Sequence, residues 1–161
     1  MEQKTKINAE DGKQDIVISR EFEIPLELLF KAFTDSEIIE QWMGTKVLKL
    51  ENKKYGAWQF ETKDGKGNVL FKANGVIHEF MPNQKITRTF EMENAGLGVQ
   101  LEFNEFEKID DYTSRLNMHV IYESVALRDQ VLKLPFAQGI NWAHNRLQEV
   151  VGKLITTQAN Q

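Results

Sequence analysis

The three histidines are the first residues to consider for acid–base or metal chemistry. His78, His119 and His144 show none of the i, i+2 or i, i+4 spacings that common metal sites use. His119 alternates with Met118 and Val120, so it should face solvent, and His144 lies at the edge of an apolar stripe. We therefore expect no metal site, and the histidines identify no catalytic residue.

The common phosphate-binding and hydrolase motifs are absent from the sequence. A phosphate-binding loop needs Gly-x4-Gly-Lys-Ser/Thr at the start of a helix, whereas Asp64-Gly65-Lys66-Gly67 indicates a hairpin turn. The chain also lacks the Gly-x-Ser-x-Gly motif of the hydrolase nucleophile elbow. It contains no cysteine, which excludes disulfides, thiolate metal ligands and a thiol nucleophile. We expect no cofactor.

Arg88 has the most direct chemical interpretation. It alternates with Ile86, Phe90 and Met92, so the period-two pattern puts it on the face of these apolar side chains. An arginine on that face would bind a carboxylate or phosphate through two parallel hydrogen bonds. Two other outcomes stay open: a β-bulge turns Arg88 outward, or its guanidinium pairs with a glutamate of the sheet such as Glu102.

Large apolar side chains are numerous enough to line a space between a sheet and a helix. The expected lining residues, including two polar anchors, are Trp42, Met43, Trp58, Phe60, Phe71, Arg88, Phe90, Phe103, Met118, Tyr122, Phe136 and Ile140. An empty cavity of about 300 Å³ would cost about 7 kcal/mol, most of the stability of a domain. Any such space is therefore small, wet or occupied.

The elements that position these residues begin with a strand over residues 14–23, where apolar and polar residues alternate. Asp11-Gly12 is a turn signal and predicts that residues 4–10 pair with this strand as a short hairpin. Pro25 opens a short amphipathic helix, and Thr34 with Glu37 has capping-box spacing, which predicts a second helix over residues 35–42. Gly44 should end that helix.

Over residues 45–123 the pattern predicts a meander of six strands, because runs of alternating apolar and polar residues are separated by turn residues. The alternation is clearest over Ile86–Met92, Val99–Phe103 and Leu116–Tyr122, and it predicts one apolar sheet face. A helix that starts near Pro135 should cover that face with a stripe of Phe136, Ile140, Ala143, Leu147, Val150 and Leu154. The pair Arg128-Asp129 precedes this helix, and adjacent residues should not face each other.

The predicted fold class is α+β, with a curved antiparallel sheet of about seven strands. Two short helices follow the first long strand, and the C-terminal helix packs across the concave face. We divide the chain into a polar segment 1–14, a single domain 15–155 and a disordered tail 156–161.

Several segments resemble the START-like (Bet v 1-like) superfamily, in the branch named after the activator of the heat-shock-90 ATPase. The resemblance rests on EIPLELLFKAFTDSEIIEQWMG at residues 23–44, Gly56-Ala57-Trp58, Gly75-Val76, and YESVALRDQVLKLPFAQGINWAHNRLQEVV at residues 122–151. The chain departs from the branch pattern at Met43, Thr45 and Trp142. The resemblance implies a helix-grip fold with an internal pocket.

Three functions follow as hypotheses. The leading one is a binding domain for a small apolar or amphipathic ligand, with Arg88 or Tyr122 as the polar anchor. The wider superfamily also implies a cyclase, dehydratase or isomerase that uses the same pocket. The name of the branch implies, by analogy alone, a protein-interaction module with a chaperone partner.

Charge and hydropathy constrain the partners and the location. The formal net charge is −4 and there is no basic cluster, which argues against nucleic-acid binding. The N-terminal residues MEQKTKINAEDGKQD lack the apolar run of a secretory signal or a membrane span. We therefore expect a cytoplasmic protein, monomeric or homodimeric, without a membrane span.

Overall fold

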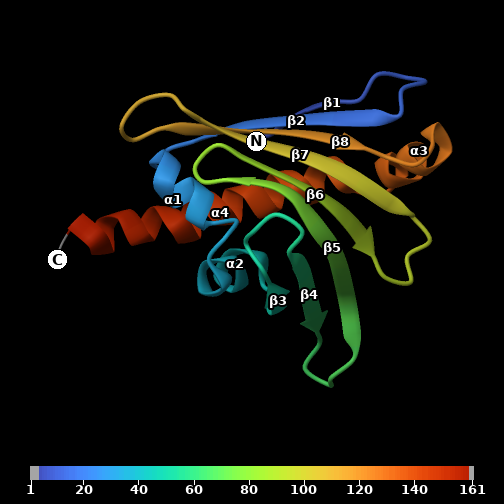
Figure 1. Cartoon of the computed structure of the whole chain (residues 1–161), viewed down its shortest axis with the longest axis horizontal. Coiled ribbons are helices and arrows are strands. Elements are labelled where there is room, and N and C mark those ends of the chain that lie inside the picture. The colour runs from blue at the N-terminus through green and yellow to red at the C-terminus, as the bar shows by residue number, and fades with distance from the viewer. Residues whose placement is uncertain (1–3, 160–161) are drawn as a thin grey trace.

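The computed structural model describes residues 4–159, and its centre is an eight-stranded antiparallel sheet (Figure 1). The strands lie in the order β1-β2-β8-β7-β6-β5-β4-β3. Their bounds are β1 Lys6–Asn8, β2 Asp15–Phe22, β3 Lys46–Leu50, β4 Ala57–Lys63, β5 Val69–Met81, β6 Lys85–Met92, β7 Val99–Lys108 and β8 Ser114–Ile121. The last six strands form the predicted meander, and β2 pairs with β8, the last of them.

The sheet has one strand more than the seven expected, because Lys6–Asn8 forms β1 and pairs with β2. Gly12 in the connecting turn has a φ of 77°, a left-handed conformation that glycine adopts without steric cost. The hairpin brings Thr5 against the C-terminal helix, where its hydroxyl lies 3.0 Å from Nδ1 of His144.

The two short helices follow β2 as predicted, but the cap of the second differs. They are α1 Leu26–Lys31 and α2 Ser36–Met43, and Gly44 ends α2 with a φ of 65°. The predicted Thr34–Glu37 capping box is wrong. Asp35 is the N-cap and accepts a hydrogen bond from the Ile38 amide at 3.1 Å, whereas the Thr34 hydroxyl donates to the carbonyl of Phe30 at the end of α1.

A third short helix, α3 Val125–Lys133, was not predicted. Ser124 caps it by accepting from the Leu127 amide at 3.1 Å. Arg128 is buried in α3 and bonds to the carbonyl oxygens of Glu10 and Asp15. Its guanidinium also reaches Oδ1 of Asp129 at 2.9 Å, so the expectation that these neighbours do not meet is wrong. The long arginine side chain can fold back onto an adjacent carboxylate.

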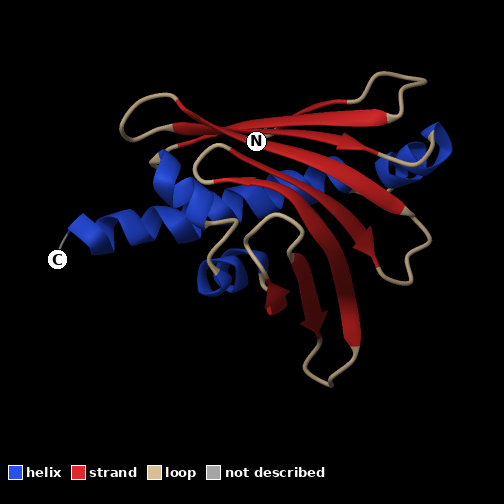
Figure 2. Cartoon of the chain, viewed as in Figure 1, coloured by secondary structure: helices blue, strands red, loops and turns tan. Residues whose placement is uncertain are grey.

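The C-terminal helix α4 spans Phe136–Ala159 and runs under the concave face of the sheet, a helix-grip-like arrangement (Figures 1 and 2). It starts where Pro135 predicts, and Leu147 and Val151 are fully buried beneath the sheet. The helix extends through residues 156–159, part of the segment expected to be disordered, while residues 160 and 161 lie outside the described residues. No helix within residues 4–159 combines the length and apolarity needed to cross a membrane.

The burial of His144 beside Arg20 predicts an acid-sensitive stability. Burial, with a smaller effect of Arg20, lowers the pKa of His144 to about 4, against about 6.5 in an unfolded chain. The unfolded state therefore takes up the proton first, and the free energy of unfolding should fall by about 3 kcal/mol as the pH drops from about 6.5 to 4. Urea unfolding across this range would measure the loss, and His144→Gln should remove that part of the pH dependence. An unchanged slope in the variant would contradict the assignment.

Candidate ligand-binding site

The candidate site lies on the inner face of strands β6, β7 and β8, the face that α4 covers. Strand register places Arg88 opposite Glu102, and Glu102 opposite the buried Val120. Successive strand residues point to opposite faces, so Gln100, Glu102 and Asn104 all point inward from β7. The central strand thus presents polar side chains to the interior of the domain.

This arrangement reverses our prediction for β7. Val99, Leu101 and Phe103 were expected on the buried face, but they lie on the outer, convex face. Phe103 is opposite His119 and Thr87, and Nζ of Lys85 lies 5.5 Å from the centre of its ring. Phe103 is therefore not part of the inner site. The alternation was real, but it did not indicate which of the two faces is buried.

Arg88 and Glu102 form the core of the site. Nε of Arg88 donates to Oε1 of Glu102 at 2.8 Å, and Nε2 of Gln100 donates to the other carboxylate oxygen at 3.0 Å. The arginine side chain is 17% exposed and the glutamate 5%. The pairing with Glu102 that we left open is confirmed, and the residue still faces inward.

Trp58 fixes the plane of the Arg88 guanidinium, whose carbon lies 4.4 Å from the centre of the indole ring. The indole is buried and its N–H donates to the carbonyl of Thr89 at 3.1 Å. Since the Glu102 contact uses Nε of Arg88, it leaves the donors of the two terminal nitrogens available to another acceptor.

Tyr122 adds a hydroxyl at the other end of this polar group. It is buried, and burial raises its pKa well above 10, with a further contribution from the Glu102 carboxylate that Arg128 partly offsets. The phenol therefore stays protonated at any physiological pH. Asn104 was not predicted as a site residue; it is also buried, and its Oδ1 has no hydrogen-bond partner within the described residues.

Two apolar clusters flank the polar group. Trp42, Trp58 and Phe60 are buried in the larger cluster, with Phe71 and Phe90 packed against it. Tyr122 belongs to the smaller cluster, against which Phe136 and Ile140 of α4 pack. Met118 contacts both clusters, which places it between them.

Two of the predicted apolar lining residues, Trp42 and Met43 in α2, lie away from the polar group on β6 and β7. The Trp42 indole N–H donates to the carbonyl of Ala32 at 2.6 Å, so this residue closes the junction between α1 and α2. Met43 is 37% exposed at the end of α2. Of the predicted set, the structure therefore brings Trp58, Arg88, Phe90, Met118 and Tyr122 together most directly.

The histidines lie outside this site. His119 is on the outer face, where its Nε2 lies 2.6 Å from Oδ2 of Asp15, and His144 contacts Thr5 at the N-terminal hairpin. Within the described part of the chain, no three histidine or acidic side chains are grouped so that they could hold a metal ion.

Comparisons with solved structures show the same fold in bacterial proteins of low sequence identity. A protein from Rhodobacter sphaeroides superposes with a TM-score of 0.82 and 18% identity, over 92% of this chain and 99% of that chain. One from Arthrobacter aurescens gives 0.81 and 12%, over 92% and 91%. One from Mycobacterium smegmatis gives 0.79 and 17%, over 91% and 95%.

Sequence comparison identifies the family. A search of curated protein sequences gives no significant match. Residues 23–152 match the family described as "Activator of Hsp90 ATPase homolog 1-like protein", a range that includes all three short helices, the whole meander and most of α4. The chain therefore belongs to this family, within the Bet v 1-like superfamily.

Proposed function

We propose that the protein binds a small amphipathic molecule between the inner sheet face and α4. The observation that carries the proposal is the polar group of Arg88, Gln100, Glu102 and Asn104, which points into the domain between two apolar clusters. Buried polar groups cost stability unless they are paired, so a half-satisfied set at this position favours a ligand that completes it. Members of the wider superfamily typically bind small ligands, which agrees with this proposal.

The charges of the site favour an uncharged polar head on the ligand. Arg88 and Glu102 neutralise each other at 2.8 Å, and the raised pKa of Tyr122 keeps its hydroxyl neutral. A ligand carboxylate would therefore meet no net positive charge and would have to compete with Glu102. A hydroxyl or carbonyl oxygen could instead accept from Arg88, and a hydroxyl could also donate to the carboxylate, at little desolvation cost.

An enzymatic role using the same residues is the second candidate, because Tyr122 has the shifted pKa that active sites often show. The direction of the shift limits this role. A phenol that holds its proton can donate a hydrogen bond to a substrate oxygen, but it cannot act as a general base. The site therefore supports binding and polarisation of a substrate carbonyl better than proton abstraction.

Native mass spectrometry tests the ligand-binding proposal directly. Protein purified without added ligand should carry a stoichiometric small adduct, which denaturation releases. If the mass is bare, titration with 1-decanol and with decanoate separates the head-group preferences, since the two share one chain length. We expect the alcohol to bind about tenfold more tightly or better, because only the carboxylate must lose its full hydration beside Glu102. A bare protein that binds neither probe would contradict the proposal.

A further inference from the structure

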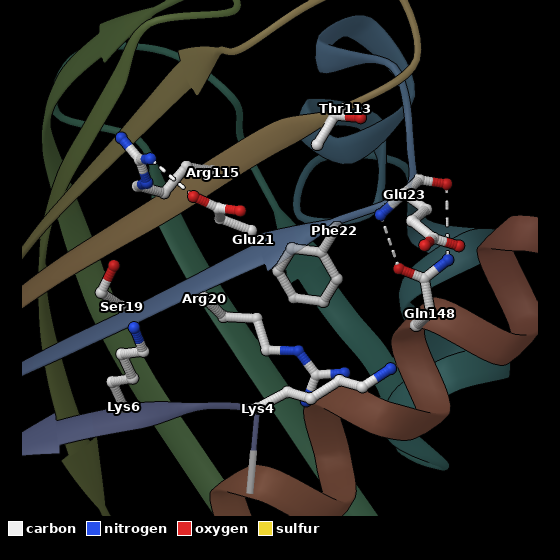
Figure 3. A pocket seen from close by; sticks show the side chains of 10 residues that line it. All are labelled: Lys4, Lys6, Ser19, Arg20, Glu21, Phe22, Glu23, Thr113, Arg115 and Gln148. Carbon is white, nitrogen blue, oxygen red and sulfur yellow. Dashed lines mark hydrogen bonds and ion pairs between the residues drawn. The ribbon is translucent and has the colours of Figure 1, made fainter. Parts of the chain in front are cut away.

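Arg20 on β2 bonds both to α4 and to the segment before β1. It points inward, only 3% of it is exposed, and it alternates with apolar residues along the strand. Its Nη1 donates to Oδ1 of Asn145 at 2.7 Å and to the Thr5 hydroxyl at 3.1 Å. Figure 3 shows its side chain extending towards α4 beside the ring of Phe22, whose centre lies 5.2 Å from the guanidinium carbon.

Thr5 extends this contact to two further residues of α4. It is 3% exposed, and its backbone N–H donates to Oδ1 of Asn141 at 3.2 Å. Its hydroxyl lies 3.0 Å from Nδ1 of His144. Because Asn141, His144 and Asn145 have i, i+3, i+4 spacing, they lie on one side of the helix. We call the five residues Thr5, Arg20, Asn141, His144 and Asn145 the α4 anchor.

The second half of α4 is held without this anchor. Leu147 and Val151 are fully buried beneath the sheet. The amide of Gln148 bonds twice to the backbone of Glu23, accepting from its N–H at 2.8 Å and donating to its carbonyl oxygen at 3.4 Å (Figure 3). Full burial and a paired amide therefore fix this half of the helix on the sheet.

The first half of α4, which covers the candidate site, is held differently. Within the described residues 136–146, only His144 of the anchor is buried. Phe136 and Ile140 are partly buried, and they pack against the cluster that contains Tyr122. The position of these two side chains over the site therefore depends on the anchor, which lies within two turns of both.

The chemistry of the anchor suits positioning better than stabilisation. The acceptors of Arg20 are a hydroxyl and amide oxygens, so a buried charge has only neutral partners, an arrangement that an apolar residue could often replace without loss of stability. Apolar packing, however, has no preferred direction, whereas hydrogen bonds fix both a distance and an angle. Buried polar contacts can thus select one arrangement of packed elements among several.

We propose that Arg20 and Thr5 are positioning residues, which fix the distance and rotation of the first half of α4 over the inner ligand site. Both residues lie before the range that matches the family, whereas their partners on α4 lie within it. The link to ligand binding rests on the proposed function. The link to the position of α4 does not, and it can be tested without a ligand.

Hydrogen–deuterium exchange of the full chain, followed by mass spectrometry, tests the position of α4. The variants are Arg20→Met, which removes the cation, and Asn145→Ala, which removes its shortest contact and leaves the sheet unchanged. Alanine favours helix more than asparagine does, so faster exchange in Asn145→Ala cannot result from helix propensity. We expect exchange over residues 140–146 to become about tenfold faster or more in both variants, since each loses a hydrogen bond with a charged group. Exchange in the sheet and over residues 147–155 should stay within about twofold of the wild type.

The matched control is Gln148→Ala, which removes an amide side chain of the same helix outside the anchor. Any change in its exchange should be confined to the second half of α4 and to Glu23, the residue that Gln148 contacts. Residues 140–146 should exchange within about twofold of the wild-type rate.

Titration of the same proteins with 1-decanol tests the link to the site. We expect the affinity to fall by about tenfold in Arg20→Met and Asn145→Ala, because a loosened helix must be ordered on binding, and to stay within about twofold in Gln148→Ala. If the wild type carries no adduct and binds no probe, the proposed function fails, and exchange alone decides the role of the anchor. Our inference is overturned if exchange over residues 140–146 is unchanged in both variants, or if it rises equally throughout the sheet. It is also overturned if the variants with a loosened helix bind 1-decanol as tightly as the wild type.

Discussion

Gly75→Ala should destabilise the fold by at least about 3 kcal/mol, a large part of the stability of a domain of this size. Gly75 lies on β5 directly opposite Trp58 on β4. A Cβ at this position would lie 2.5 Å from Nε1 of Trp58 and even closer to the Thr89 carbonyl oxygen, far inside van der Waals contact with both. The same indole nitrogen donates to that oxygen, so a methyl group would break the bond and push β6 away.

Chemical denaturation of Gly75→Ala and Gly139→Ala provides the measurement and its control. Gly139 lies within α4, and a Cβ there meets no atom within 4 Å. Alanine at that helical position should therefore stabilise the protein by about 0.5–1 kcal/mol. Opposite signs for the same substitution would establish that contact with Trp58 requires glycine at position 75. A cost below about 1 kcal/mol at Gly75 would show that β5 and β6 can separate easily and would contradict this packing.

Much of the fold could be predicted from the sequence because its signals are local. Turn residues separate the strands of the meander, and α4 is long enough for its 3.6-residue period to be clear. The helix α3 was missed for the same reason, since Arg128 stands among its apolar residues and hides the stripe. Its side chain is stabilised by carbonyl groups of Glu10 and Asp15, more than a hundred residues away in sequence.

The site was harder to predict because its polar residues are stabilised by partners on other strands. Alternation in β7 fits either face, and we assigned the apolar residues to the interior. The correct assignment depends on Arg88, which pairs with Glu102 only after β6 and β7 align. Arg20 on β2 was not singled out from the sequence, and its acceptors likewise lie on other elements, Thr5 before β1 and Asn145 on α4. A charged residue within an apolar series is thus the signal to follow, but its partner must come from the structure.

Arg88→Met should cost about 3–5 kcal/mol of stability, because it leaves the Glu102 carboxylate buried and unpaired. Only 5% of that side chain is exposed, and Gln100 is its remaining hydrogen-bond donor in the site. The control is Arg115→Met, which removes an arginine paired with two glutamates, Glu21 and Glu107, on the outer face of the sheet. Because both glutamates are more than half exposed, water replaces the lost contacts, and we expect a much smaller change than for Arg88→Met.

The double variant Arg88→Met/Glu102→Leu separates stability from function. Replacing both members of a buried ion pair by apolar residues is often neutral, so the double variant should recover most of the stability that Arg88→Met loses. Urea unfolding of the wild type, Arg88→Met, Glu102→Leu and the double variant measures the recovery. If the pair exists to anchor a ligand, the stable double variant should still lose the adduct in native mass spectrometry or the preference for 1-decanol over decanoate. A double variant that is stable and keeps its ligand would show that the pair only fills the interior, and the proposed binding site would then have to lie elsewhere.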